Sequence, residues 1–273
     1  MRDPSRTLAA FYSIDELSRR RSPVHDRHPV ALCASTAGFM IAVASFGRRD
    51  VSAILPLFLY PVLTLALADL RPAELFRRLA AVAPAILAIA ALNPVFESAP
   101  VRVGPWTVAG GWLSFVSLAA KLTLTVSAAF LLVATAGMNG VAAGLRAAGI
   151  PKLIILVLQT TYRYVALLLA EVAGMSRAHE LRSGPRKGVG RTLWGPMLGG
   201  LLLRSYDRAG RVHDAMGLRG FDGEFRTGKA ARFGKADALY CSSWLSFFAL
   251  VRFVDVTGAL GRMMEGLAFG VVR

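Results

Sequence analysis

Long apolar runs separated by short basic segments dominate the first half of the chain. Residues 29–47, 51–68 and 79–96 contain no charged residue, and residues 108–138 contain only Lys121. A weaker run extends from 238 to about 256 and is interrupted by Arg252 and Asp255. Because a helix needs about 20 apolar residues to cross the bilayer core, we predict an all-α, polytopic membrane protein with about five transmembrane helices.

The composition is consistent with this pattern. Of the 273 residues, 55% are hydrophobic and 18% are charged, and the net charge is +15. Soluble domains carry about 25% charged residues. A nucleic-acid-binding protein with this charge would display it on a water-soluble core rather than between charge-free runs. We therefore expect the lipid bilayer, and no nucleic acid, as a partner.

Arginine and lysine set the predicted orientation, because cytoplasmic loops carry an excess of both. Several arginines lie in the N-terminal segment and between the second and third runs, whereas residues 98–107 carry Arg102 alone. Arg48 and Arg49, in the first short turn, oppose this scheme. Residues 177–235 hold 13 basic and 5 acidic residues, a net charge of +8. We predict a membrane protein with the N-terminus and this basic block in the cytoplasm.

Four segments follow from the apolar runs and the charges. Residues 1–28 are a cytoplasmic N-terminal segment, and residues 29–138 hold transmembrane helices one to four. Residues 139–236 form a cytoplasmic helical region, and residues 237–273 form a C-terminal membrane segment.

The cytoplasmic region is expected to contain two long helices. Residues 153–170 have the length of a span, but Gln159 and Arg163 near their middle favour a helix packed at the interface over a bundle-facing span. This helix continues to Leu181-Arg182-Ser183, where Gly184 and Pro185 end it. A second helix begins near Thr192 and ends at Leu218-Arg219-Gly220.

The second helix carries an apolar stripe at spacings of three and four residues. We predict that this stripe packs on neighbouring helices, and it consists of Tyr206, Ala209, Val212, His213 and Met216.

Both helices have an arginine at their C-terminal end. A helix C-terminus carries partial negative charge, so an arginine there is stabilised while its guanidinium remains free to bind carboxylates or carbonyls of a partner. One such end is ordinary capping chemistry. Two ends, at Arg182 and Arg219, favour a paired contact with a partner.

Other motifs that carry chemistry are weak in this chain. Residues 223–230 have GxxxxGK spacing, but Ala230 replaces the Ser or Thr that would hold Mg²⁺, and no strand precedes the motif. The four histidines form no HxxxH or HExxH pattern, and Cys33 and Cys241 form no CxxC motif. We expect no metal, cofactor or catalytic group here, and we expect Lys121 to face the bundle or the interface rather than a pathway.

Four stretches resemble a known family. They are SIDELSRRRSPVHDRHP at 13–29, LLVATAG at 131–137, LRAAGIPKLIILVLQTTYRYVALLLAEVAGMSRAHELRS at 145–183, and RAGRVHDAMGLRGFDG at 208–223. Over residues 14–255 the chain resembles the transmembrane (T) component of energy-coupling factor (ECF) transporters, and within it the CbiQ-like proteins of cobalt uptake systems.

The resemblance implies a non-catalytic scaffold in an ABC-type importer of the bacterial inner membrane. Its cytoplasmic coupling helices transmit the ATP-driven movement of two ABC-type ATPases to a separate, CbiM-like substrate-binding membrane subunit. A small accessory membrane subunit is a further candidate partner, and ATP is bound by the ATPases.

In that family, two coupling helices end in Ala-Arg-Gly-like motifs that dock into grooves on the ATPases. The matching residues here have Leu in place of Ala twice and Ser in place of Gly once, and they are Leu181, Arg182, Ser183, Leu218, Arg219 and Gly220.

The predicted substrate is cobalt, because the His28-Pro29 pattern and the long basic second half resemble the cobalt type. Nickel, biotin or another vitamin stay open, since the partner subunit largely decides the substrate. An integral-membrane enzyme at the lipid interface is an alternative class. An autonomous ion channel is disfavoured, because no repeated polar stripe runs through the spans.

Overall fold

The computed structural model describes residues 12, 16–18, 20, 22–47, 50–96, 100–103, 106–183, 194–223, 225 and 233–253. The chain divides into two compact units. The bundle unit comprises Arg20–Ala136 and Ala231–Arg273, and the helix-pair unit comprises Met1–Arg19 and Gly137–Ala230.

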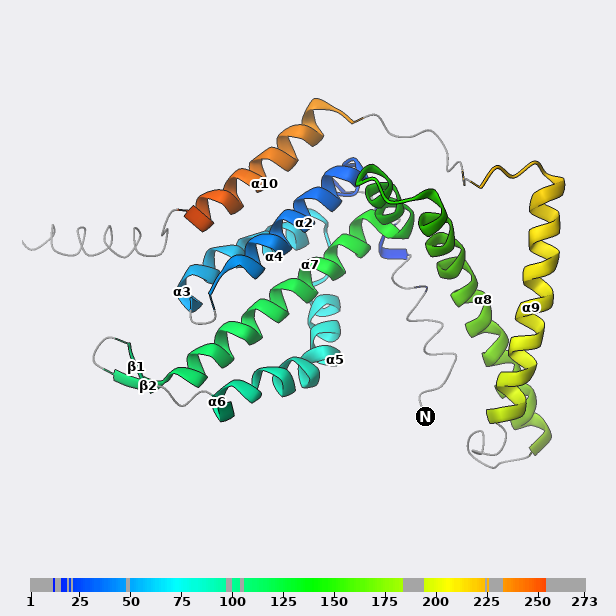
Figure 1. Cartoon of the computed structure of the whole chain (residues 1–273), viewed down its shortest axis with the longest axis horizontal. Coiled ribbons are helices and arrows are strands. Elements are labelled where there is room, and N and C mark those ends of the chain that lie inside the picture. Colours follow the sequence, from blue (N-terminus) through cyan, green and yellow to red (C-terminus); the bar gives the residue numbers. More distant parts are fainter. Residues whose placement is uncertain are drawn as a thin grey trace, which may run out of the picture. The chain divides into compact units, whose positions relative to one another are not determined.

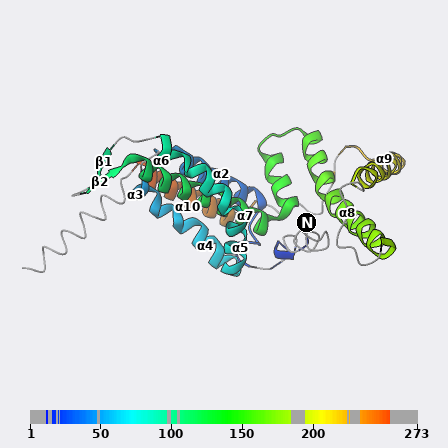
Figure 2. The same ribbon diagram turned by 90° about the horizontal axis from the view of Figure 1, so that it is seen from below.

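The bundle unit is built from apolar helices (Figure 1, Figure 2). In chain order these are α2 (Pro29–Ser45), α3 (Val51–Ile54), the 3₁₀ helix η1 (Leu55–Phe58), α4 (Leu59–Leu67), α5 (Pro72–Ala90), α6 (Leu92–Phe96), the first part of α7 (Gly110–Ala147) and α10 (Lys235–Phe253). α2 and α5 both begin with a proline, whose fixed φ suits the first turn of a helix. The ring of His28 caps α2 by accepting a 3.2 Å hydrogen bond at Nδ1 from the Val30 N–H.

An aromatic cluster forms the core of the bundle unit. Tyr60 from α4 stacks on Phe39 from α2 at 4.6 Å between ring centroids, and it meets the edge of Trp244 from α10 at 4.8 Å. The Tyr60 hydroxyl lies 2.9 Å from Thr36 Oγ1, so its polar end is satisfied inside the cluster. α7 contributes Leu124 and Ala128 to the same core. α10 is therefore an integral part of the bundle.

The two ends of α10 are attached to α2 by polar contacts. At the first turn, Asp237 accepts hydrogen bonds from the backbone N–H groups of His28 and Gly234, each at 3.0 Å. At the last turn, Arg252 donates to Ser45 Oγ and its guanidinium lies over the Phe46 ring. Arg252, whose charge weakens the predicted span at residues 238–256, thus has partners in Ser45 and Phe46 at the end of α10.

Lys121 caps the end of α2. Its ammonium donates to the carbonyl oxygens of Phe46 at 2.7 Å and Gly47 at 2.8 Å, which a helix end leaves without intrahelical partners. This places the lysine of α7 in a structural role within the bundle, as its expected bundle-facing position implies.

A short antiparallel hairpin precedes α7. Strands β1 (Pro100–Val103) and β2 (Trp106–Ala109) pair with Val101 opposite Val108. The charge pattern predicts an external link at residues 98–107 and gives no signal for these strands.

α7 is interrupted at Gly137, whose φ of 63° and ψ of 173° are not helical. A left-handed φ is accessible to glycine without steric cost. A Cβ atom at this position would also lie 3.0 Å from Ser18 Oγ. The helix continues to Ala147 and ends with Gly149 at a φ of 85°. The helix-pair unit then follows with α8 (Lys152–Ser183) and α9 (Trp194–Leu218).

Within the described residues, three helices are long and apolar enough to cross a membrane. They are Pro72–Pro94, Gly110–Ala147 and Lys152–Arg182, and Pro29–Ser45 and Val51–Leu67 are shorter apolar helices. The all-α polytopic membrane fold predicted from the sequence is therefore confirmed. α8 has the length and composition of a transmembrane span. The sequence favours a helix packed at the interface instead, because Gln159 and Arg163 lie near the middle of this segment. Arg48 and Arg49 lie outside the described residues.

Candidate functional site

The candidate site is the pair formed by α8 and α9 in the helix-pair unit. Figure 1 shows the two helices side by side and running in opposite directions. The C-terminus of α8 therefore lies at one end of the pair, and the C-terminus of α9 lies at the other. Both helix ends that close on an arginine belong to this pair.

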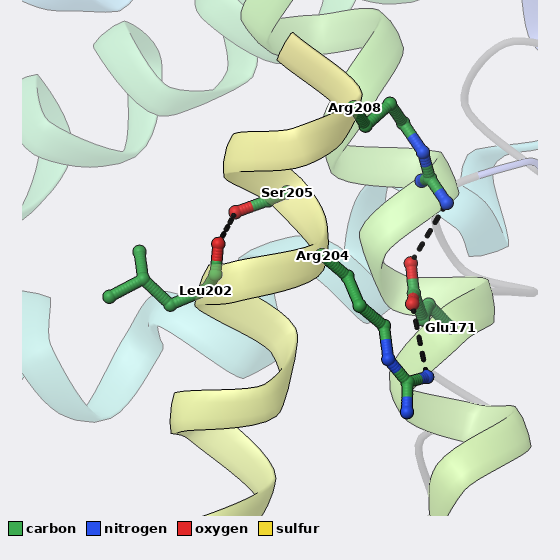
Figure 3. A network of polar contacts seen from close by, with 5 residues as sticks. All are labelled: Glu171, Leu202, Arg204, Ser205 and Arg208. Atoms are coloured by element: carbon green, nitrogen blue, oxygen red, sulfur yellow. Dashed lines mark hydrogen bonds and ion pairs between the residues drawn. The ribbon is translucent and has the colours of Figure 1, made fainter. Parts of the chain in front are cut away.

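One carboxylate joins the two helices near the middle of the pair. Glu171 of α8 contacts Arg204 Nη1 at 3.3 Å through Oε1 and Arg208 Nη2 at 3.2 Å through Oε2 (Figure 3). The Glu171 side chain is 15% exposed, against 31% for Arg208 and 59% for Arg204. On the same stretch of α9, Ser205 Oγ donates to the Leu202 carbonyl at 2.8 Å. A shielded carboxylate with two arginine partners is stronger than a fully exposed ion pair.

The face of α9 that packs within the chain differs in part from the predicted stripe. Val212 and Met216 are half-buried, as are Ser205 and Arg208 at the same helical spacing. Tyr206 is 79% exposed. Ala209 and His213 are exposed as well.

The predicted stripe is therefore covered by the described residues only at Val212 and Met216, and the packing role of Tyr206 and Ala209 stays a prediction. The physical reason is the position of Glu171, which draws the arginine-bearing face of α9 toward α8. The stripe from Leu198 through Leu202 to Tyr206 then remains exposed.

The C-terminus of α9 is closed by a Schellman motif. The Phe221 N–H donates to the Met216 carbonyl at 3.0 Å, and the Gly220 N–H donates to the Gly217 carbonyl at 3.0 Å. Gly220 has a φ of 68°, in the left-handed region. Arg219 is then the C-cap residue, held at the end of the helix with its side chain exposed. Leu218 beside it is 90% exposed.

The C-terminus of α8 presents a similar surface at the opposite end of the pair. Arg182 lies in its last turn and is exposed, and Leu181 is 82% exposed. Ser183 is the last residue of α8. Glu171 precedes Arg182 by 11 positions, and the two arginines that face Glu171 precede Arg219 by 15 and 11 positions, so at 1.5 Å per residue the helix-end arginines are about 33 to 39 Å apart along the helix axes. The predicted docking residues thus lie at two separate helix ends, where Leu181, Arg182, Leu218, Arg219 and Gly220 are exposed.

The described residues contain no cluster of three metal-ligating side chains. Cys33 and Cys241 are free thiols. Most of the GxxxxGK segment, including Lys229 and Ala230, lies outside the described residues.

Comparison with known protein families shows to which family the chain is related. Residues 21–229 match the model of the CbiQ family, described as cobalt transport protein. The chain belongs to the CbiQ family. This confirms the resemblance to the CbiQ-like T components of ECF transporters and makes the chain a membrane component of the cobalt-transport type.

A relative of unstated function matches part of the chain. The uncharacterized protein MJ1571 of Methanocaldococcus jannaschii is 27% identical to this CbiQ-family chain over 119 residues, which are 42% of this chain and 40% of the relative. The aligned region therefore spans less than half the length of that relative.

Sequence reasoning missed the polar contact between the helices. Glu171 and Arg204 are 33 positions apart on two different helices, and their pairing depends on how α8 and α9 pack. A signal was present in the sequence, because Arg208, Val212 and Met216 recur at a spacing of four and so share one face of a helix. An arginine on a half-buried face needs an acceptor opposite, and a carboxylate is one such acceptor.

Proposed function

We propose that this chain is the transmembrane coupling subunit of an ECF-type ABC importer for cobalt. Two cytoplasmic ATPases would bind ATP and dock on the ends of α8 and α9, and a separate CbiM-like membrane subunit would bind the substrate. The chain itself would bind no ATP and catalyse no reaction. It would lie in the bacterial inner membrane with its N-terminus and the α8–α9 pair on the cytoplasmic side, where the apolar positions of α8 would lie at the membrane interface rather than across the bilayer.

The observation that carries this proposal is the placement of Arg182 and Arg219 at opposite ends of one helix pair. Each arginine is exposed and stands beside a leucine with more than four-fifths of its surface exposed. Exposed leucines beside a helix-end arginine provide an apolar contact and a charged anchor at each end. A separation of about 33 to 39 Å suits two partner molecules better than one shared groove.

The net charge of the region that holds α8 and α9 suits partners whose docking grooves are acidic. Residues 177–235 carry a net charge of +8, which attracts acidic partner surfaces and accelerates their association. The same charge favours a cytoplasmic location for this part of a membrane protein.

The test is to replace both arginines in the complex as it is purified from its own membranes. Each helix-end arginine should contribute about 1.5 to 3 kcal/mol through charge-assisted hydrogen bonds. Arg182→Ala and Arg219→Ala should each weaken ATPase association about tenfold to one-hundredfold and slow ATP-driven uptake of radiolabelled cobalt.

Matched controls come from exposed arginines on the same helices. Arg177→Ala on α8 and Arg211→Ala on α9 remove the same charge away from the helix ends and should retain wild-type association. If the double variant of Arg182 and Arg219 still binds the ATPases and transports at the wild-type rate, the coupling role is wrong.

Substrate and reaction class are tested in the same preparation. Mass spectrometry of the co-purified subunits identifies the substrate-binding partner, and competition of cobalt uptake by nickel or biotin ranks the alternative substrates. Turnover of a lipid-interface substrate by the purified chain without ATPases would support an integral-membrane enzyme instead.

A further inference from the structure

The α8–α9 pair lacks an apolar core on the α9 side. None of the described residues of α9 is buried. A Cβ atom built on Gly174 of α8, or on any of five glycines of α9, would meet no atom within 4 Å, and these five are Gly195, Gly199, Gly200, Gly210 and Gly217. Side-chain packing alone therefore defines the crossing of these two helices weakly.

The contacts of Glu171 restrain the crossing of α8 and α9, which side-chain packing defines only weakly. Its two carboxylate oxygens contact two arginines that are one helical turn apart, at 3.3 Å and 3.2 Å (Figure 3). Two separate contacts to successive turns of α9 restrain both the position of α9 along α8 and its rotation about its own axis. A single exposed ion pair would restrain neither.

The burial of the carboxylate makes this contact costly to lose. Glu171 is 15% exposed, and its Oε2 and Arg208 Nη1 are buried atoms without a hydrogen bond, so the Arg208 contact is an ion pair. Neutralising Glu171 would leave the partly shielded guanidinium of Arg208 without this partner. The two helices would then separate or slide until Arg208 reaches water, which Arg204, 59% exposed, already does.

We propose that Glu171 is a positioning residue that fixes the crossing of α8 and α9 and thereby the spacing between the Arg182 and Arg219 ends. The proposal rests on the coupling function proposed above, because the spacing matters only if both ends engage partners. Glu171 lies 11 residues before Arg182, and the arginines that it contacts lie 15 and 11 residues before Arg219. A change of crossing at this central contact therefore displaces both ends.

The direct test measures the distance between the helix ends in the full-length chain. Spin labels at Ala178→Cys and Ala215→Cys, both exposed positions, report on α8 and α9 after Cys33→Ser and Cys241→Ser remove the native thiols. Pulsed electron paramagnetic resonance in lipid nanodiscs should give a narrow distance distribution for the wild-type chain.

Glu171→Gln should convert this narrow distribution into a broad or displaced one. Glu180→Gln is the matched control, because it makes the same change at an exposed glutamate of the same helix and should leave the distribution unchanged. A Glu171→Gln distribution that superimposes on the wild type would overturn the proposal.

Further variants separate positioning from folding. If Glu171→Gln does not yield folded protein, Arg208→Gln and Arg204→Gln are measured instead. Arg208→Gln should broaden the distribution more, since Arg208 is the less exposed of the two arginines. Equal, wild-type distributions for both arginine variants would also overturn the proposal. Glu171→Asp should partly restore the narrow distribution, since it keeps the charge.

The uptake assay distinguishes this inference from the function on which it rests. Glu171→Gln should lower ATP-driven cobalt uptake while Arg182 and Arg219 are intact. If the helix-end variants lose uptake and Glu171→Gln keeps both the distance and the uptake, the positioning role alone is wrong. If the helix-end variants transport normally, the coupling function is wrong whatever the distance measurement gives.

Discussion

Replacing Gly220 by alanine tests whether the backbone at the end of α9 presents Arg219 to a partner. The φ of 68° at Gly220 closes the Schellman motif that makes Arg219 the C-cap residue. A Cβ atom at this position would meet nothing within 4 Å. The variant therefore changes the backbone preference and adds no steric clash with the rest of the chain.

The expected magnitude follows from the left-handed conformation. A residue with a Cβ atom pays about 1 to 2 kcal/mol to adopt it. The Gly220→Ala chain either pays this cost when the ATPase binds or leaves the last turn of α9 frayed. In both cases we expect ATPase association to weaken about 5-fold to 30-fold. Gly220→Asn should weaken it less, because asparagine tolerates the left-handed region better than alanine.

Gly149 provides the control for a general loss of stability. It ends α7 with a φ of 85°, and the surrounding hydrogen bonds, Ile150 N–H to Leu145 O and Gly149 N–H to Arg146 O, form the same motif. A Cβ atom at Gly149 also meets nothing within 4 Å. Gly149→Ala should lower the melting temperature about as much as Gly220→Ala and leave ATPase affinity unchanged.

The assay is titration of the purified ATPases onto the chain in nanodiscs, with melting temperature measured in parallel. Wild-type affinity for Gly220→Ala would refute the reasoning about Arg219. Equal losses of affinity in the Gly220 and Gly149 variants would also refute it, since the effect would then be one of overall stability.

Two predictions concern the bundle unit and are read from thermal unfolding in detergent. Trp244→Ala should destabilise the unit by about 3 to 5 kcal/mol, because it empties the centre of the aromatic cluster, and an unchanged melting temperature would show that α10 does not belong to the core. Lys121→Met should lower the melting temperature, because it leaves the Phe46 and Gly47 carbonyls without their donor, and Lys121→Arg should recover part of the loss. A methionine variant as stable as wild type would contradict the capping role.

The sequence predicted the helical membrane fold because long charge-free runs have few alternative structures. Residues 29–47 and 51–68 correspond closely to α2 and to the α3–η1–α4 segment. The break at Gly137 was not predicted, since one glycine in an apolar run is common in membrane helices. The hairpin β1–β2 was also missed, because it depends on pairing across a short turn.

The candidate site was only partly accessible to sequence reasoning. Arg182 and Arg219 could be placed at helix ends because Gly and Pro residues mark those ends locally. The packing face of α9 could not be placed, because the apolar stripe through Tyr206 is exposed and the face bearing Arg208 turns toward Glu171. Periodicity identifies a stripe, and only the fold decides what covers it.

The central claim is that the two helix ends contact the ATPases. Photo-crosslinking from the exposed positions Leu181, Leu218 and Tyr206 in the assembled complex tests it most directly. We predict crosslinks to ATPase subunits from Leu181 and from Leu218, and none to an ATPase from Tyr206. If neither leucine position crosslinks to an ATPase, or if Tyr206 does so equally well, the docking assignment is contradicted.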